Sequence, residues 1–378
     1  MTSRGYLRPV RPTEIESLEE FDGFVERGIR SLSGFHLQSL ALADRSEALA
    51  RLDVAGAVFL GCRFVAGTGP GSELDVRRRG GLVFPAVPDV PFNPYRAELY
   101  TPAELYAGLD RGYAATLDAA AYAWSRTPRT LDKSLAMALH DHAIDDAVEE
   151  FTAGRRIVGV MGGHAVRRDA PAYLAAARLG RTLADHTGLT VLTGGGPGAM
   201  EAVNLGTWLS DAPDAELVEA VGLLAAVPDF APDVTAWAQA AFAVLARWPG
   251  GTESLGIPTW FYGHEPPNLF ATRVAKYFRN ALREDVLLAL CRAGVVFLPG
   301  AAGTVQEIFQ AACANYYTRP ELVAPMVLVG RDYWAEQLPA WPLLEVLGGR
   351  GALGPRLHLV DDAAEVLPLL LEIGGSRR

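Results

Sequence analysis

The segment LTVLTGGGPGAME, residues 189–201, has the pattern of a strand, a glycine turn and the start of a helix. Its first five residues form a short apolar run typical of a buried parallel strand, and the glycine turn that follows opens a helix. The same succession occurs at RIVGVMGGH (156–164) and at GVVFLPGAAGT (294–304). Strands that alternate with helices predict the α/β class, with a doubly wound, Rossmann-like parallel sheet. Three further apolar runs complete the predicted strands, at 254–258, 325–330 and 356–360.

The alternation begins after Gly154, which predicts a domain boundary, because a helix commonly ends at a glycine before a new strand. We expect residues 1–153 to form an N-terminal domain, an α/β extension of unknown role. Residues 154–378 should form a nucleotide-binding domain. Within it, an Ala- and Trp-rich stretch at about 209–250 predicts a helical insertion.

Further elements follow from local patterns. Helices are expected over 171–187, over 269–292 and within 101–151, where Ala and Leu recur at helical spacing. In the N-terminal part, VAGAVFLGCRF (54–64) predicts a buried strand, and the Gly- and Pro-rich stretch 67–94 predicts loops. We expect no internal repeat.

Composition and charge limit the function. The net charge of −10 argues against a nucleic-acid polymer as partner, because such binding requires a basic face. Cys62, Cys291 and Cys313 are too few and too scattered for a disulfide framework or a metal site. The first residues lack a signal-peptide pattern, and Arg292 interrupts the longest apolar run. We therefore expect a cytoplasmic protein that binds neither a membrane nor a metal.

Three glycine turns follow predicted strands: the first turn at 162–164, the second at 193–198 and the third at 299–304. Glycine lets a phosphate approach the backbone, and the helix that follows directs free N–H groups to the same place. Each turn alone could be a plain strand–helix turn. Three at one sheet edge favour a phosphorylated ligand. None matches GxGxxG with its acidic partner or a P-loop.

TGGGPGAMEAVNLG (193–206) and PGAAGTVQE (299–307) resemble the two signature segments of the Lonely Guy (LOG) family, usually written GGGxGxM(E) and PGGxGTxxE. GIPTWFYGHEPPN (256–268) is similar to a further family segment, and the resemblance covers about 155–335. It implies a phosphoribohydrolase that cleaves the N-glycosidic bond of a nucleoside 5′-monophosphate into free base and ribose 5-phosphate. It also implies that no cofactor is needed, and that the protein is a homodimer or higher homo-oligomer.

The resemblance assigns two catalytic residues. Glu307 ends the second motif and would stabilise the charge on the ribose and orient the attacking water. By spacing alone, Thr304 and Glu307 could instead form a helix capping box. Arg283 would hold the base or position Glu307. Alternative cations nearby are Arg273, Arg279 and Lys276.

The other expected contacts lie in the glycine turns. Residues expected to bind substrate or phosphate are Gly163, Thr193, Gly194, Gly195, Gly196, Gly198, Met200, Glu201, Pro299, Gly300, Gly303 and Thr304. Met200 could equally be a core residue, and His164 a simple turn residue. Ala301 departs from the family's second glycine, which leaves the phosphate geometry open.

Two alternatives remain. The same fold could belong to a non-catalytic nucleotide- or cofactor-binding protein, because fold does not determine function. Residues 1–150 could carry a regulatory role with either activity. The cluster HDHAIDDA (140–147) has helical spacings that could suit a metal, but without a complete ligand set it favours a solvated helix face.

Overall fold

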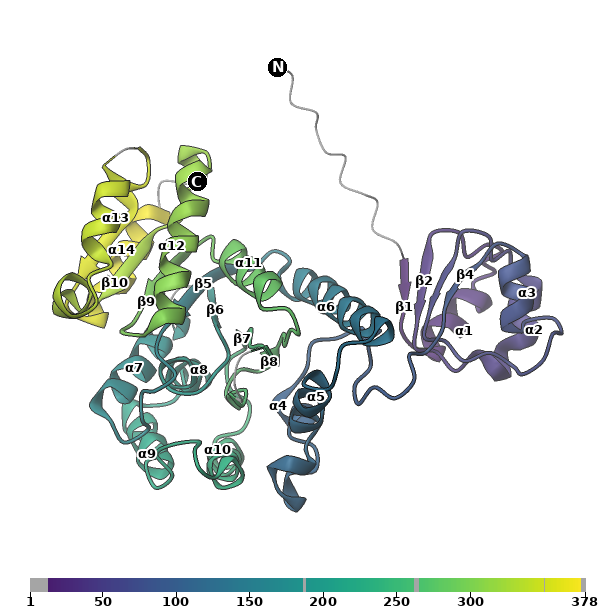
Figure 1. Cartoon of the computed structure of the whole chain (residues 1–378), viewed down its shortest axis with the longest axis horizontal. Coiled ribbons are helices and arrows are strands. Elements are labelled where there is room, and N and C mark those ends of the chain that lie inside the picture. The colour runs from purple at the N-terminus through teal and green to yellow at the C-terminus, as the bar shows by residue number, and fades with distance from the viewer. Residues whose placement is uncertain (1–12, 186–187, 262–264, 350, 375–378) are drawn as a thin grey trace. The chain divides into compact units, whose positions relative to one another are not determined.

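The computed structural model describes residues 13–185, 188–261, 265–349 and 351–374 (Figure 1). Residues 1–12, which lack a signal-peptide pattern, and residues 262–264 of the 256–268 motif therefore lie outside the described residues. The chain forms two compact units, Met1–Glu98 with Arg129–Ala143, and Leu99–Pro128 with Ile144–Arg378. The division falls within helix α6 (Leu131–Thr152). The boundary expected near residue 153 stays a prediction.

A four-stranded parallel sheet in the order β1-β2-β3-β4 organises the first unit. Its strands are β1 (Thr13–Ile15), β2 (Phe35–Gln38), β3 (Val58–Leu60) and β4 (Leu82–Phe84). Helices α1 (Leu18–Glu26), α2 (Ser46–Arg51) and α3 (Glu73–Arg78) connect them. Inward side chains such as Leu37, Leu49 and Phe59 form its core.

The strands of this unit follow one another at nearly regular intervals along the chain. Thr13 pairs with Phe35, His36 with Val58, and Val58 with Leu82, which sets successive strands 22, 22 and 24 residues apart. The stretch 67–94, expected to be loops, contains α3 and β4. Strands of three or four residues carry too little alternation to be recognised from the sequence.

A seven-stranded parallel sheet in the order β11-β10-β9-β5-β6-β7-β8 organises the second unit. Its strands are β5 (Arg156–Met161), β6 (Leu189–Thr193), β7 (Ser254–Gly256), β8 (Arg273–Val274), β9 (Gly294–Phe297), β10 (Met326–Val329) and β11 (Leu357–Val360). All six of its pairings are parallel. The predicted α/β class with a doubly wound, Rossmann-like parallel sheet is confirmed.

Helices cover both faces of this sheet (Figure 1). Those that lie between or beside the strands are α7 (Pro171–Asp185), α8 (Ala199–Trp208), α11 (Asn280–Leu290), α12 (Ala302–Tyr317), α13 (Trp341–Gly348) and α14 (Val366–Gly374). The stretch 209–250 contains α9 (Asp214–Leu224) and α10 (Val234–Arg247). The helix expected over 269–292 begins only at Asn280, because β8 precedes it and pairs with β7. No helix among the described residues is both long and apolar enough to cross a lipid bilayer.

The strand order places a topological switch point between β5 and β9. From β5 the chain adds β6, β7 and β8 on one side, and then crosses back to place β9 on the other side of β5. Right-handed crossovers therefore place α7 and α8 on one face and α12 and α13 on the other. Ligands of such sheets bind beyond the carboxyl ends of the strands at this point.

Residues 99–128 belong to the second unit and contain α4 (Pro102–Leu105) and α5 (Leu117–Ser125). Asp118 is buried and attaches this segment to the rest of the unit. Its Oδ1 accepts hydrogen bonds from Lys276 Nζ at 2.5 Å and from Trp260 Nε1 at 2.7 Å. The Tyr106 hydroxyl donates to the Pro267 carbonyl at 2.7 Å. These contacts position both ends of the 256–268 loop.

Candidate functional site

A cavity of about 670 Å³ lies at the switch point, beyond the carboxyl ends of β5, β6, β7 and β9. Its volume suits a cofactor-sized ligand. Of the residues predicted from the sequence, those that line the cavity are Gly163, Gly194, Gly196, Met200, Arg283, Pro299, Gly300, Gly303, Thr304 and Glu307. Thr193, Gly195, Gly198 and Glu201 lie outside the lining.

Backbone hydrogen bonds join the three glycine turns to one another. The Gly163 N–H donates to the Pro299 carbonyl at 3.0 Å, and the Ala199 N–H donates to the Gly163 carbonyl at 3.0 Å. The turns pack too closely for side chains. A Cβ on Gly198, whose φ is +72°, would lie 2.6 Å from the Gly163 oxygen. A Cβ on Gly300 would lie 2.2 Å from Thr304 Oγ1. Glycine is therefore needed at both positions.

Helix α12 presents an open N-terminus to the cavity. Its N-cap is Ala301, and no side chain of the described residues forms a cap hydrogen bond there. Thr304 is buried in the first turn, whereas Gly303 faces open space. Glu307 does not form the capping box considered above, because its carboxyl group meets Arg283 instead. The first N–H groups of α12 remain available to an anion.

Asn268 holds the second turn in place, and the sequence reasoning did not assign it a role. Its N–H donates to the Gly195 carbonyl at 2.8 Å, and its Nδ2 donates to the Gly196 carbonyl at 3.1 Å. Thr193, expected to contact the ligand, lies behind the turn, where its hydroxyl donates to Asn204 Oδ1 at 2.7 Å. The segment Glu265-Pro-Pro-Asn268 was the signal that could have identified Asn268.

Glu201 lies on the far side of α8 from the cavity. It forms a buried ion pair with Arg168, with Nη2 and Oε1 2.5 Å apart. Arg168 also donates to the Trp237 carbonyl at 3.0 Å and lies over the Trp237 ring. Trp237 is in α10, so Glu201 ties the helical insertion to the helix that follows the second turn. Met200, one residue earlier, lines the cavity.

An acidic cluster with one arginine forms part of the cavity wall. We name Arg283, Glu284 and Glu307 the Arg283 cluster. Arg283 Nη2 lies 3.0 Å from Glu284 Oε1, and Nη1 lies 3.5 Å from Glu307 Oε1. Its Nε donates to Asn280 Oδ1 at 3.2 Å. Glu284 is 2% exposed, and its Oε2 has no hydrogen-bond partner among the described residues. Sequence reasoning missed Glu284.

Burial raises the pKa of both carboxyl groups of the Arg283 cluster. Burial, reinforced by the neighbouring Glu284, raises the pKa of Glu307 from 4.5 to about 8, although Arg283 opposes the shift. Burial also raises the pKa of Glu284. Glu307 is therefore largely protonated at neutral pH.

The alternative cations lie elsewhere. Arg273 is in β8, and Arg279 is the N-cap of α11. Lys276 is buried against Asp118, and this burial lowers its pKa. Arg283 is the one lysine or arginine that the described residues contribute to the cavity lining.

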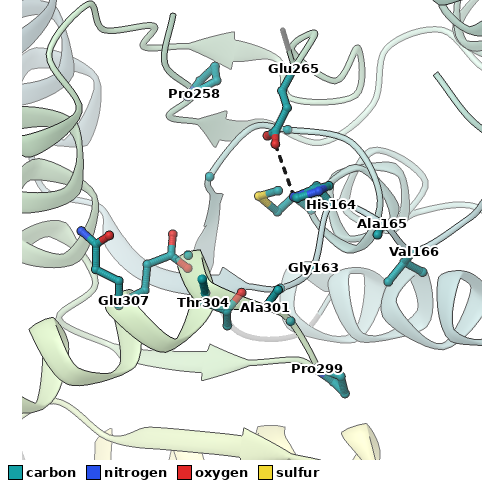
Figure 2. A pocket seen from close by; sticks show the side chains of 18 of the residues that line it. Gly163, His164, Ala165, Val166, Pro258, Glu265, Pro299, Ala301, Thr304 and Glu307 are labelled. Atoms are coloured by element: carbon teal, nitrogen blue, oxygen red, sulfur yellow. Dashed lines mark ion pairs between the residues drawn. The ribbon is translucent and has the colours of Figure 1, made fainter. Parts of the chain in front are cut away.

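His164 and Glu265 lie at the exposed side of the cavity, with Nδ1 and Oε1 3.3 Å apart (Figure 2). Figure 2 also shows Thr304 and Glu307 on α12, away from this pair. Residues 262–264, between Pro258 and Glu265, lie outside the described residues. Tyr333, which follows β10, donates from its hydroxyl to the Gly300 carbonyl at 2.9 Å. Neither Tyr333 nor Glu265 was predicted from the sequence.

The HDHAIDDA cluster is only in part the solvated face that the sequence favoured, because Asp146 is exposed whereas other members are buried. His140 and Asp141 are both buried, and the His140 ring packs against Phe92 with centroids 5.0 Å apart. Asp145 Oδ1 accepts a hydrogen bond from Tyr277 at 2.8 Å. Within the described residues, no group of three or more His, Cys, Asp or Glu side chains is arranged to hold a metal ion.

Comparisons with known proteins do not support the LOG resemblance. No family model matches the chain, and no curated protein matches it. Among similar solved structures, a molybdenum cofactor binding protein from the phototrophic bacterium Rippkaea orientalis shows 17% identity and a TM-score of 0.35, over 58% of this chain and 97% of that one.

Two further structures come from Chlamydomonas reinhardtii, and both are molybdenum cofactor carrier proteins. One shows 18% identity and a TM-score of 0.36, over 58% of this chain and 99% of that one. The other shows 20% identity and a TM-score of 0.33, over 59% of this chain and 99% of that one.

These findings correct the expected enzymatic function. The similar structures are cofactor-binding and carrier proteins, so the assignments of a LOG-family nucleosidase and of a nucleoside 5′-monophosphate substrate were wrong.

Proposed function

We propose that this chain binds a phosphorylated cofactor without cleaving it, in the cavity at the switch point. The observation that carries the proposal is the convergence of three glycine turns, two of which precede helices, on one cavity at the carboxyl edge of the sheet. Backbone N–H groups and a helix N-terminus together favour an anion without a surplus of basic side chains. This fits a chain with a net charge of −10.

The third turn and the start of α12 are the proposed phosphate site. Gly303 has open space where a side chain would lie, and Thr304 lies beside Gly300. A phosphate at this place would meet the first N–H groups of α12. Ala301 has an ordinary negative φ of −96°, so its methyl group requires no strain in this turn. Arg283 is the nearby fixed positive charge of the cavity wall.

The molybdenum cofactor is the first ligand to test, because the similar structures are described as molybdenum cofactor binding and carrier proteins. Its organic part is a phosphorylated pterin, and the cavity has both the volume and a glycine edge suited to a phosphate. In this proposal, the third turn would hold the phosphate and the Arg283 cluster would contact the ring. The metal would give the cofactor its redox chemistry, and this chain's residues would bind it and limit its contact with water.

Gly303 offers a sharp test of the phosphate site. Gly303→Glu places a negative charge in open space at the N-terminus of α12, where an acidic residue is compatible with the helix. Gly303→Ala is the uncharged control. Thermal shift with inorganic phosphate and with the molybdenum cofactor should show stabilisation of the wild type and of Gly303→Ala. The Gly303→Glu protein should fold normally and show none. Equal stabilisation of all three would reject this phosphate site.

A further inference from the structure

The Arg283 cluster has more hydrogen-bond acceptors than donors. Each of its two carboxyl groups has two oxygens, and Arg283 reaches one oxygen of each. Asn280 Nδ2 adds a contact at 3.4 Å, but to the same Glu284 Oε1. Glu284 Oε2 stays without a partner in the part of the chain that the structure describes, although Glu284 is 2% exposed.

An unpartnered buried oxygen costs stability and calls for an explanation, since nearly all such atoms in folded proteins are paired. The neighbouring side chains do not supply the missing donor. Neither Glu307 nor Arg283 forms a hydrogen bond to Glu284 Oε2, and Arg283 is already shared between the two carboxyl groups. Glu284 lines the cavity, so a bound ligand can supply an N–H group.

The cavity is therefore polarised. The glycine turns and the start of α12 provide donors and a positive helix end, which suits an anionic group. The Arg283 cluster provides acceptors and, with one arginine against two carboxyl groups, no surplus of positive charge. A ligand that satisfies both regions has a phosphate at one end and N–H donors at the other.

We propose that the Arg283 cluster binds the N–H edge of an aminopyrimidinone ring, the edge that pterins and guanine share. Glu284 Oε2 would accept a hydrogen bond from the exocyclic amino group or from the adjacent ring N–H, because it is the oxygen of this carboxyl group that Arg283 and Asn280 leave without a partner. This inference rests on the proposed function and deepens it by naming the ring class. Glu284 would then select the ligand, whereas the glycine turns would bind its phosphate.

The test compares two ligands that differ only at this edge. Neopterin monophosphate carries the exocyclic amino group, and its lumazine analogue carries an oxygen there. Calorimetric titration of the wild-type protein should show about 10- to 100-fold tighter binding of the pterin, as expected for a hydrogen bond to a charged group. Guanosine 5′-monophosphate is a third probe, which distinguishes recognition of the edge from recognition of the pterin ring.

Glu284→Gln should abolish the preference for the pterin, because its amide places a donor against the amino group. Asp285→Asn is the matched control. Asp285 is the next residue of α11, is exposed, and accepts a hydrogen bond from Gln310 outside the cavity lining. It should keep the wild-type ratio. A ratio of affinities is not altered by a general loss of stability.

The outcomes separate the two proposals. Equal wild-type affinities for the pterin and the lumazine would overturn the ring assignment and leave phosphate binding intact, since both carry the phosphate. A preference that survives in Glu284→Gln would overturn the role of Glu284. If neither probe binds the wild-type protein, this inference fails, and the thermal shift of the wild type against Gly303→Glu decides whether the proposed phosphate site fails with it.

Discussion

The Gly163 N–H donates to the Pro299 carbonyl oxygen at 3.0 Å, and this bond joins the turn after β5 to the turn after β9. These two strands are neighbours in the sheet but are separated in the chain by β6, β7 and β8. The bond therefore closes the switch point where the two halves of the sheet diverge. It positions the first and third glycine turns against each other, with the cavity beside them.

Gly300→Ala should destabilise the protein by about 1–3 kcal/mol, the usual cost of overpacking. The added Cβ would lie 2.2 Å from Thr304 Oγ1 and 3.0 Å from the Gly163 nitrogen. Gly303→Ala is the matched control, because a Cβ there meets nothing within 4 Å. It should be neutral or stabilising by up to about 1 kcal/mol. Urea unfolding without ligand measures both, and equal effects would contradict this packing.

Glu307 should make stability fall as the pH rises. Its pKa is raised from 4.5 to about 8 on folding, so between these values the folded state holds a proton that the unfolded state has lost. The free energy of unfolding should therefore decrease by up to about 1.4 kcal/mol per pH unit across this window. The contribution is complete below the lower value and lost above the upper one.

Glu307→Gln resembles the protonated carboxyl group and should remove much of this slope. Above about pH 8 the variant should be more stable than the wild type, and the difference should shrink toward acidic pH. The raised pKa of Glu284 contributes a slope of the same sign, so the variant's curve should not become flat. Identical slopes for variant and wild type would show that Glu307 ionises normally in the folded protein.

Glu201→Ala should cost about 3–5 kcal/mol, because it leaves the buried Arg168 without its counter-charge. Asp214→Ala is the comparison. It breaks the Arg178–Asp214 pair, whose side chains are about half exposed, and should cost at most about 1 kcal/mol. Chemical denaturation compares the two. A small effect at Glu201 would mean that the insertion is held by other contacts.

Asn268→Ala should loosen the second turn. It removes the acceptor of the Phe270 and Ala271 N–H groups and the donor to the Gly196 carbonyl. Each buried group left unpaired costs about 1–3 kcal/mol. Asn93→Ala, at an exposed asparagine, should cost far less. Hydrogen exchange of residues 193–198 should accelerate only in the Asn268 variant, and unchanged protection would contradict its anchoring role.

Much of the second unit could be predicted from the sequence, because buried parallel strands are continuous apolar runs. RIVGVM matches β5, and LTVLT matches β6. The two-residue strand β8 could not be predicted, since so short a segment has no periodicity, and the stretch around it was expected to be helical. The first unit depends on strands of three or four residues at intervals of 22 or 24, which single-segment patterns do not reveal.

The candidate site could likewise be predicted only in part from the sequence. Its glycine turns are visible in the sequence because strand, turn and helix are adjacent in the chain. Asn268 holds Gly196, 72 residues earlier in the chain, so spacing did not identify its role. Glu284 adjoins Arg283 in the chain, but its burial and its place in the cavity wall depend on the tertiary fold. Met200 and Glu201 are adjacent in the chain, but their side chains lie on different faces of α8. Residues one apart differ by about 100° around the axis, so Met200 lines the cavity while Glu201 contacts Arg168.

We propose that the switch-point cavity binds a phosphorylated cofactor and leaves it intact. The most direct measurement is calorimetric titration of the wild-type and Gly303→Glu proteins with neopterin monophosphate, followed by mass analysis of the recovered ligand. We expect one ligand per chain for the wild type, unchanged mass after release, and no binding by Gly303→Glu. A cleaved ligand, or equal binding by both proteins, would contradict it.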